Sequence, residues 1–205
     1  AFDKNAALRE TPAMPAHVRG FEPGPRAVSG DEVFVYLQGF APHSPAVMAA
    51  LLSLRRSTRA HIPDLYPDDR AVLGAAGVIL EEEVLPIGKI MERSGCVLHH
   101  GGVGLASACL SAGLPQVILS NQADHRRSGD FVAREGLGEH CAFSKATTAW
   151  IVEATRRAYD DDALRSECRA RAAEFASWFG HDPTERVARE ACRLIGIDQR
   201  SPEVA

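Results

Sequence analysis

Short apolar runs alternate with amphipathic stretches along most of this chain. Residues 33–37 form a nearly continuous apolar run, which is typical of a strand buried on both faces. Shorter runs at 59–62, 77–80, 96–98 and 116–119 predict further strands. Helical patterns and their end signals predict helices at about 44–54, 68–74, 86–93, 105–112, 127–136, 146–159, 161–179 and 183–195.

The alternation of strands and helices predicts the fold class. Successive strand–helix–strand units favour right-handed crossovers, which build a parallel sheet with helices on both faces. We therefore expect an α/β fold, a Rossmann-like three-layer domain with a mainly parallel sheet, over residues 31–197. Residues 1–30 hold four prolines and three glycines without periodicity, so we expect a linker or arm there, and a tail at 198–205. This opening, without an initiator Met, leads us to expect a piece of a longer protein.

The composition of the chain disfavours two classes of binding partner. The formal net charge is -4, so the chain offers no overall basic field to nucleic acid or to an anionic membrane surface. No apolar run approaches the roughly 20 residues of a membrane-spanning helix. The five cysteines are scattered and form no Cys-x-x-Cys pair, which favours reduced thiols in a cytoplasmic protein. We expect neither nucleic acid nor membrane among the partners.

A glycine-rich turn lies between the strand predicted at 96–98 and the helix predicted at 105–112. It reads HHGGVG at positions 99–104. Glycines let the backbone bend sharply and approach a ligand closely. Free N–H groups at a helix start bind phosphate, with about 0.3–1 kcal/mol from the helix dipole. His99 is placed to donate to a phosphate oxygen; the alternative is that the glycines only form a tight strand-to-helix turn.

A second polar feature follows the next predicted strand. Gly113 and Pro115 end the preceding helix, and Asp124 comes shortly after the strand at 116–119. Both turns then lie at the carboxyl edge of a parallel sheet, where open α/β folds bind ligands. The Asp124 carboxylate can accept hydrogen bonds from the vicinal hydroxyls of a sugar. The alternative is that Asp124 caps the helix after it.

These features occur together in HHGGVGLASACLSAGLPQVILSNQADH, residues 99–125. The block resembles the donor-binding signature of the UDP-glycosyltransferase superfamily (family 1). Its bacterial natural-product members show HHGG-x-GT, an alanine-rich helix, AG-[VL]-PQ-[VL] and an Asp-Gln pair. The sequence VLP at 84–86 matches a loop of the same family. The resemblance covers residues 30–195 and implies the C-terminal half of a GT-B fold, which holds most of the donor.

The resemblance assigns donor-binding roles by position. The donor would be a UDP-sugar or a TDP-sugar, bound without a metal or a resident cofactor. The implied contacts are His99 and the backbone of Gly102, Val103 and Gly104 for the diphosphate, Val84 and Leu85 for the nucleobase, and Asp124 and His125 for the donor sugar.

The resemblance also implies a reaction. In this family a His of the N-terminal, acceptor-binding domain deprotonates the acceptor hydroxyl, so we expect no catalytic residue in this chain. The sugar would pass to a hydroxyl of a small-molecule acceptor with inversion at the anomeric carbon. Helix N–H groups and His99 would stabilise the leaving diphosphate. This chain alone is therefore expected to bind the donor without transferring the sugar.

Several positions depart from the family pattern. Leu105 stands at a usual Thr or Ser, Ser107 at a frequent Glu and Ser120 at a common Pro. His125 replaces the usual Gln, which makes this sugar contact partly titratable near neutral pH. The lost side-chain contacts keep a second hypothesis open: a non-catalytic nucleotide-sugar-binding or interaction module of the same fold.

Two other hypotheses are disfavoured. Adjacent histidines at a strand end point to opposite sides, so His99, His100, Asp124 and His125 would rarely share one metal ion. A dinucleotide-dependent oxidoreductase would carry G-x-G-x-x-G after the first strand, whereas residues 39–42 read GFAP.

Overall fold

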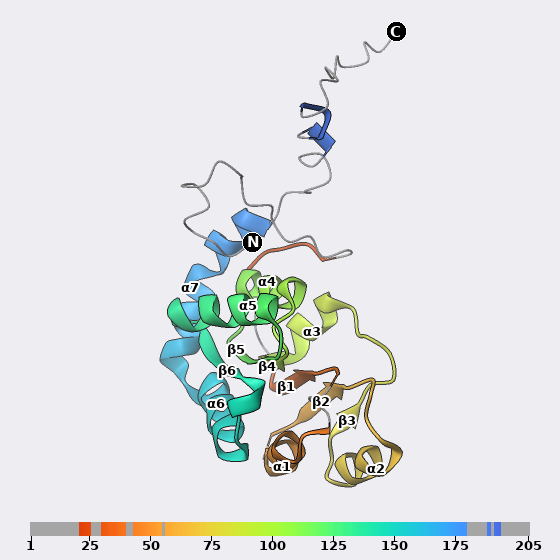
Figure 1. Ribbon diagram of the computed structural model, residues 1–205. Coiled ribbons are helices and arrows are strands. Elements are labelled where there is room, and N and C mark those ends of the chain that lie inside the picture. The colour runs from red at the N-terminus through yellow and green to blue at the C-terminus, as the bar shows by residue number, and fades with distance from the viewer. Residues whose placement is uncertain are drawn as a thin grey trace.

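The computed structural model describes residues 21–25, 30–39, 43–54, 56–179, 188–189 and 191–193. Strands and helices alternate along the chain, as the apolar pattern predicts (Figure 1). The strands are β1 Glu32–Tyr36, β2 Thr58–His61, β3 Ile79–Leu80, β4 Ser94–His99, β5 Gln116–Ser120 and β6 Gly138–Ala142. The helices are α1 Pro45–Ser53, α2 Pro67–Ala75, α3 Ile87–Arg93, α4 Val103–Ala112, α5 Ala123–Arg134, α6 Thr148–Asp160 and α7 Asp162–Phe179, with a short 3-10 helix η3 at Phe143–Lys145.

The sheet is parallel throughout, in the order β3-β2-β1-β4-β5-β6. The chain moves outward from β1 to β3, returns to β4 beside β1, and then moves outward in the other direction. This reversal makes a topological switch point between β1 and β4, where open α/β sheets bind ligands beyond the carboxyl ends of their strands. The glycine-rich turn follows β4 and therefore lies at the switch point.

Helices cover both faces of the sheet, which confirms the three-layer α/β prediction (Figure 1). Helices α1, α2 and α6 pack on one face, against Val33 and Val35 of β1. On the other face, α3 and α4 pack around Phe34, and α4, α5 and α7 pack over Ile118 of β5. Val33, Phe34 and Val35 are all buried, because a parallel strand between two helical layers has no face toward solvent.

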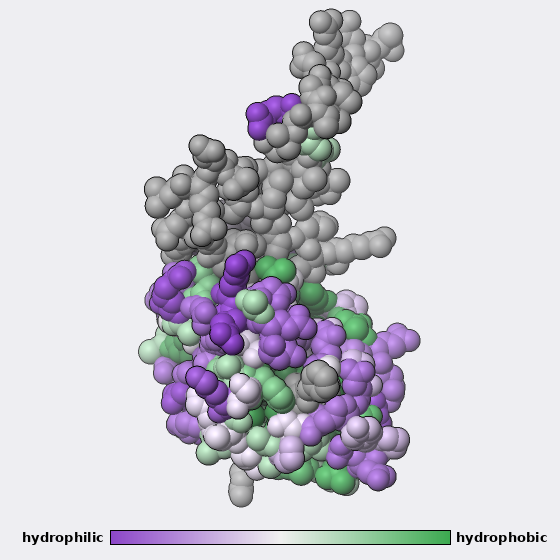
Figure 2. Space-filling view, in the orientation of Figure 1, coloured by the Kyte–Doolittle hydropathy of each residue, from purple (hydrophilic) through white to green (hydrophobic). Residues whose placement is uncertain are grey.

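Two elements differ from the prediction. Helix α5 begins at Ala123, not near 127, because its first turn is polar and lacks the apolar spacing that marks the buried face of a helix. Hydrophilic residues also cover the outer side of α5 in the space-filling view (Figure 2). Strand β6 is absent from the prediction, because its residues GEHCA are only partly buried and pair through the backbone at the edge of the sheet.

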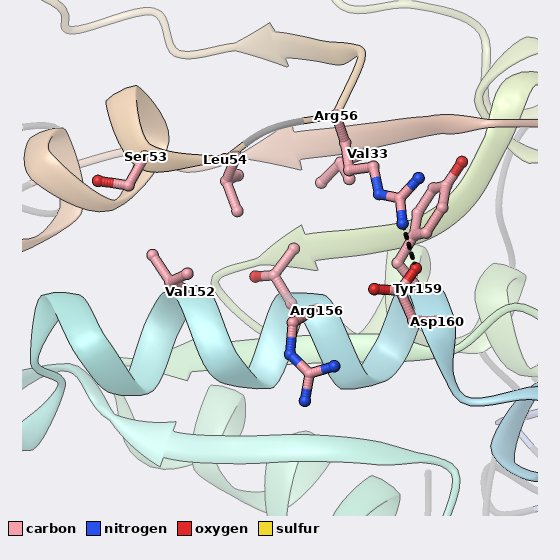
Figure 3. A pocket seen from close by; sticks show the side chains of 9 residues that line it. Val33, Ser53, Leu54, Arg56, Val152, Arg156, Tyr159 and Asp160 are labelled. Atoms are coloured by element: carbon pink, nitrogen blue, oxygen red, sulfur yellow. Dashed lines mark hydrogen bonds and ion pairs between the residues drawn. The ribbon is translucent and has the colours of Figure 1, made fainter.

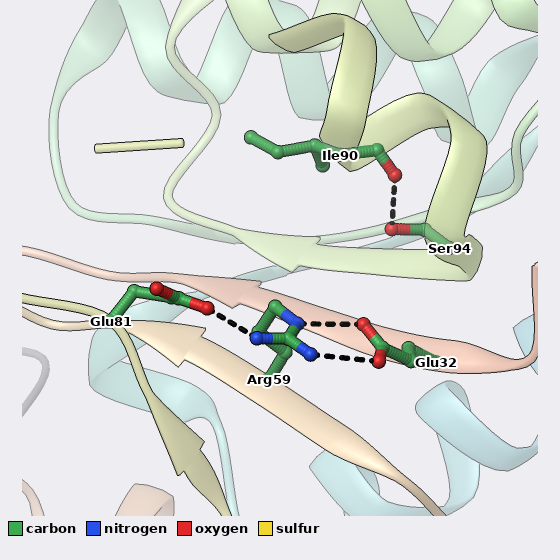
Figure 4. Close-up of polar contacts among 5 residues, drawn as sticks. All are labelled: Glu32, Arg59, Glu81, Ile90 and Ser94. Atoms are coloured by element: carbon green, nitrogen blue, oxygen red, sulfur yellow. Dashed lines mark hydrogen bonds and ion pairs between the residues drawn. The ribbon is translucent and has the colours of Figure 1, made fainter. Parts of the chain in front are cut away.

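An ion-pair network joins three elements on one side of the sheet (Figure 4). Arg59 of β2 donates to the Glu32 carboxylate through Nε at 2.8 Å and Nη2 at 3.0 Å, and it also pairs with Glu81 after β3. The Arg59 guanidinium holds the pKa of Glu32 below its usual value. Nearby, the Ser94 hydroxyl donates to the Ile90 carbonyl at 2.6 Å, where α3 ends and β4 begins. Arg59 therefore links β1 and β2 to the segment after β3.

The predicted arm and tail lie largely outside the described residues, as does most of the helix predicted at 183–195. The boundaries of arm, domain and tail therefore stay predictions. Within the described part of the arm, Phe21 is 8% exposed and packs into the cluster of α3 and α4. None of the described helices is long and apolar enough to cross a membrane.

Candidate functional site

The turn between β4 and α4 requires glycine at Gly101 and is tightly packed at Gly102. Gly101 has a φ of 99°, and a Cβ there would lie 2.8 Å from the His125 carbonyl oxygen. Gly102 is the N-cap residue of α4, and a Cβ on it would lie 3.0 Å from Nε2 of His100. Within the described residues, no side chain caps this helix. The N–H groups of the first turn of α4, from Val103 and Gly104 onward, are thus left for a ligand.

His99 is buried beneath this turn and is bonded through both ring nitrogens. The Gly101 N–H donates to Nδ1 at 3.2 Å, and Nε2 lies 3.0 Å from Oε1 of Gln116. Gln116 in turn donates to the Ala106 carbonyl of α4 at 3.3 Å. Burial lowers the pKa of His99 to about 3, so the ring is neutral at physiological pH. A direct bond from His99 to a phosphate would require one of these two contacts to be exchanged.

Gln116 is a residue whose role the sequence-based reasoning missed. The apolar pattern places it only at the start of β5, yet it is fully buried and joins β4, β5 and α4 through its side chain. The available signal was a polar residue at the first position of a buried apolar strand, since buried amides need hydrogen-bond partners. Gln116 therefore belongs to the support of the glycine-rich turn.

Asp124 and His125 lie in the first turn of α5, beside the glycine-rich turn. The Asp124 side chain is 74% exposed, and its Oδ2 lies 3.8 Å from Nε2 of His125. The His125 ring is largely covered, and its Nδ1 lies 2.9 Å from Oδ1 of Asn121. Because the Asn121 oxygen accepts, Nδ1 carries a proton, and Nε2 faces the carboxylate. Asp124 is thus free to accept hydrogen bonds from a ligand, while His125 is held by Asn121.

A row of aromatic rings continues from His125 along the carboxyl edge of the sheet. His100 lies 4.6 Å from His125 and 5.1 Å from Tyr36 between ring centroids, and Tyr36 lies 5.7 Å from His61. Burial and the neighbouring His125 lower the pKa of His100, and burial raises the pKa of Tyr36. Tyr36 and His61 end β1 and β2, so the sequence alone could not show that Tyr36 lies against both His61 and His100.

The structure also places the residues expected to contact the nucleobase and two residues that depart from the family pattern. Val84 is 62% exposed in the loop before α3, and Leu85 packs against the cluster of α3 and α4. Leu105 is buried in that same cluster, so it offers no contact to a phosphate. The Ser107 hydroxyl donates to the Val103 carbonyl at 2.7 Å inside α4.

Among the described residues, no group of three or more His, Cys, Asp and Glu side chains is arranged to hold a metal ion. A cavity of about 370 Å³ lies at the opposite, amino edge of the sheet, between the end of α1 and α6 (Figure 3). Arg56 pairs with Asp160 at its rim, and Val33 and Thr155 also line it. The Thr155 hydroxyl is buried and has no hydrogen-bond partner among the described residues.

A parallel α/β domain with a glycine-rich turn at its switch point is the architecture of the C-terminal half of GT-B glycosyltransferases. The glycosyltransferase VinC, solved in complex with DTDP, matches with a TM-score of 0.68 and 19% identity, over 92% of this chain and 49% of VinC. Os79 from O. sativa, solved in complex with UDP, matches with a TM-score of 0.64 and 15% identity, over 80% of this chain and 40% of Os79.

The chain belongs to the family described as "Erythromycin biosynthesis protein CIII-like, C-terminal domain", whose model matches residues 68–192. It is thus a C-terminal domain of the kind found in family 1 glycosyltransferases. The elloramycin glycosyltransferase ElmGT of Streptomyces olivaceus is 36% identical over 63 residues, which are 31% of this chain and 16% of ElmGT. The chain spans about half the length of the solved enzymes, and its matches cover a quarter or less of the curated relatives.

Proposed function

We propose that this domain binds a UDP-sugar or TDP-sugar at the switch point and presents it for transfer to a small-molecule hydroxyl. One observation carries the proposal: the glycine-rich turn packs directly on the first turn of α5. Gly101 approaches the His125 carbonyl so closely that a Cβ would lie 2.8 Å from it. An anion-binding helix start and the exposed Asp124 carboxylate therefore lie next to each other, as a diphosphate bonded to a sugar requires.

The diphosphate would be bound mainly by backbone groups. Gly102, Val103 and Gly104 supply the uncapped start of α4, whose N–H groups and dipole favour an anion. His99 supports this turn from below through Gly101 and is neutral, so any phosphate contact that it makes would be a hydrogen bond from a neutral donor and not an ion pair. With Leu105 buried and Ser107 bonded inside α4, the backbone provides most of the binding energy.

The donor sugar would contact Asp124 and His125. The exposed Asp124 carboxylate accepts hydrogen bonds from sugar hydroxyls, and the charge on the carboxylate makes such bonds strong. His125 is oriented by Asn121, which fixes the ring relative to Asp124. Val84 and Leu85, in the loop before α3, are the proposed nucleobase contacts. The nucleotides in the structures of VinC and Os79 support either base, since one was solved with DTDP and the other with UDP.

In the whole enzyme, the acceptor and the catalytic base would come from an N-terminal domain facing the carboxyl edge. The acceptor oxygen would attack the anomeric carbon while the bond to the diphosphate breaks, which inverts the configuration. The N–H groups at the start of α4 would stabilise the charge that develops on the leaving diphosphate. We propose a cytoplasmic location for this chemistry, because nucleotide sugars and reduced thiols both occur in the cytoplasm.

A non-catalytic module of the same fold is the second candidate. Leu105 and Ser107 favour it, because neither side chain reaches a ligand from its place in α4. Titration calorimetry of the folded chain with UDP, TDP, UDP-glucose and TDP-glucose tests the donor site. We expect heat with at least one nucleoside diphosphate; no heat with any of the four ligands would overturn the proposal and leave an interaction module.

Two single variants test the residue assignments. His99→Ala should weaken binding of the free diphosphate and of the nucleotide sugar alike, because it removes the support of the glycine-rich turn. Asp124→Ala should weaken only the sugar-bearing ligand. An equal loss for both ligands in the Asp124 variant would remove the sugar assignment.

A further inference from the structure

His140 of β6 connects two neighbouring elements through its two ring nitrogens. Its Nε2 lies 2.8 Å from Oγ of Ser120, the last residue of β5, and its Nδ1 lies 3.0 Å from Oδ1 of Asp130 in α5. An ionised carboxylate only accepts hydrogen bonds, so Asp130 holds a proton on Nδ1. In the neutral ring, Nε2 then accepts from the Ser120 hydroxyl. One imidazole therefore joins β5, β6 and α5.

The order Ser–His–Asp is that of a hydrolytic triad, but the burial is reversed. In a nucleophilic triad the aspartate is buried and the serine faces the substrate. Here Ser120 is 3% exposed, whereas 62% of the Asp130 side chain is exposed. Because the Ser120 hydroxyl cannot reach an external substrate, this arrangement orients the chain and does not attack a ligand.

The packing around the ring leaves it little freedom. A Cβ on Gly129 would lie 2.3 Å from Cδ2 of His140, so α5 approaches the ring this closely only because residue 129 has no side chain. Only 10% of the His140 side chain is exposed. The backbone of α5 therefore packs directly against the imidazole that β6 carries, and it restricts the movement of the ring.

The segment that His140 fixes carries the two proposed sugar contacts. Ser120 stands just before it, Asp130 lies in the middle of α5, and Asp124 and His125 lie between them. Since the first turn of α5 packs on Gly101, a shift of α5 along β5 would move Asp124 relative to the start of α4. Small displacements of this kind weaken binding, because hydrogen bonds depend steeply on distance and angle.

We propose that His140, through Ser120 and Asp130, is a positioning residue that sets the affinity for the sugar of the donor. The inference rests on the proposed function, because it takes Asp124 as the sugar ligand. It also gives the departure at position 120 a physical meaning. Where the family pattern has Pro, a residue that restrains the backbone covalently, this chain has a hydroxyl that restrains the same strand end through His140.

Calorimetry of variants, with UDP and TDP as sugar-free probes and UDP-glucose and TDP-glucose as sugar-bearing probes, tests this role. Ser120→Ala and His140→Ala should each weaken the sugar-bearing probes about fivefold, as expected for about one hydrogen bond, and leave the sugar-free probes nearly unchanged. Ser120→Thr keeps the hydroxyl and should restore the affinity. Glu139→Gln is the matched control, because Glu139 is the preceding residue of β6 and pairs with Arg157 of α6 instead.

A double variant separates positioning from general destabilisation. If His140 acts through the first turn of α5, then the losses of Asp124→Ala and His140→Ala should be clearly less than additive in the double variant. Additive losses, equal losses for both kinds of probe, or no loss at all would overturn the inference. If His140→Ala does not fold, Ser120→Ala with its Thr counterpart decides. A wild-type chain that binds no probe overturns the proposed function itself, whereas a selective loss in Asp124→Ala with full affinity in both His140→Ala and Ser120→Ala overturns only this inference.

Discussion

Nε2 of His99 donates to Oε1 of Gln116 at 3.0 Å, and this contact ties the carboxyl end of β4 to the first residue of β5. The bond continues from Gln116 to the Ala106 carbonyl, so the strand before the glycine-rich turn and the helix after it share one polar chain. Because every member is buried, the chain is stable only when all of its hydrogen bonds are made. It fixes the geometry of the turn without facing the ligand.

The buried His99 predicts a pH-dependent stability. Its pKa in the folded state is about 3, below the value of 6.5 expected in the unfolded chain. As the pH falls below about 6.5, His99 becomes protonated in the unfolded state but stays neutral in the folded state. The free energy of unfolding therefore falls by up to about 1.4 kcal/mol per pH unit. His100, whose pKa is also lowered, adds in the same direction.

Urea unfolding at several pH values between 7 and about 5.5 measures this slope. That window lies about one pH unit or more above the ordinary glutamate pKa of 4.5, so Glu32, whose pKa is lowered in the folded state, keeps its own contribution throughout it. His99→Gln should be less stable at pH 7 but should show a smaller slope. An unchanged slope in that variant would mean that a group other than His99 causes the pH dependence of stability.

Gly101→Ala should destabilise the domain by about 2 kcal/mol or more and abolish diphosphate binding, because the added Cβ meets the His125 backbone at a positive φ. Gly136→Ala is the matched control. Gly136 also has a positive φ, of 67°, but no atom in the part of the chain that the structure describes lies within 4 Å of the added Cβ, so only a backbone cost of about 1 kcal/mol is expected. Thermal unfolding and calorimetry with TDP compare the two, and equal effects would show that close packing at Gly101 is unimportant.

Thr155→Val should stabilise the domain by about 1 kcal/mol, because it replaces a buried hydroxyl that has no hydrogen-bond partner among the described residues by a methyl group of the same shape. Thr148→Val is the control, since the Thr148 hydroxyl donates to the Ala46 carbonyl at 3.2 Å. Losing that bond should cost about 0.5–1.5 kcal/mol. Urea unfolding measures whether each variant has a higher or a lower free energy of unfolding than the wild type. A destabilised Thr155→Val would show that the hydroxyl has a hydrogen-bond partner in solution.

Arg59→Met should destabilise the domain by about 1–3 kcal/mol, because it leaves the partly buried carboxylates of Glu32 and Glu81 without their shared partner. In the exposed pair of Arg156 with Glu153, the same change should have a much smaller effect, because water screens the two charges. The free energies of unfolding at pH 7 compare the two variants. Similar small values would mean that water screens the Arg59 network as fully as the surface pair.

Much of the fold was predictable because apolar periodicity marks buried strands directly. The apolar runs located β1, β2, β4 and β5 to within two residues, because strands buried on both faces have few polar positions. The same signal failed for β6 and for the start of α5. Both lie at edges, where backbone pairing or polar side chains replace apolar burial.

The candidate site was predicted as a location, but its internal contacts were not. The spacing of the glycines and Asp124 placed both turns at one edge of a parallel sheet. Gln116, the partner of His99, lies 17 residues away from it along the chain. Ser120, a partner of His140, lies 20 residues away from it. No local pattern marks such pairs, because each polar residue there resembles an ordinary strand or helix position.

The α/β alternation, the glycine-rich turn and the family resemblance can all be recognised in the amino-acid sequence, because they depend on the spacing of residues that are near in the chain. The neutral state of His99, its contact with Gln116 and the link that the His140 imidazole makes between β5 and α5 become visible only in the folded domain. Burial and hydrogen bonding set the state of a histidine, and both depend on which distant segments the fold brings into contact.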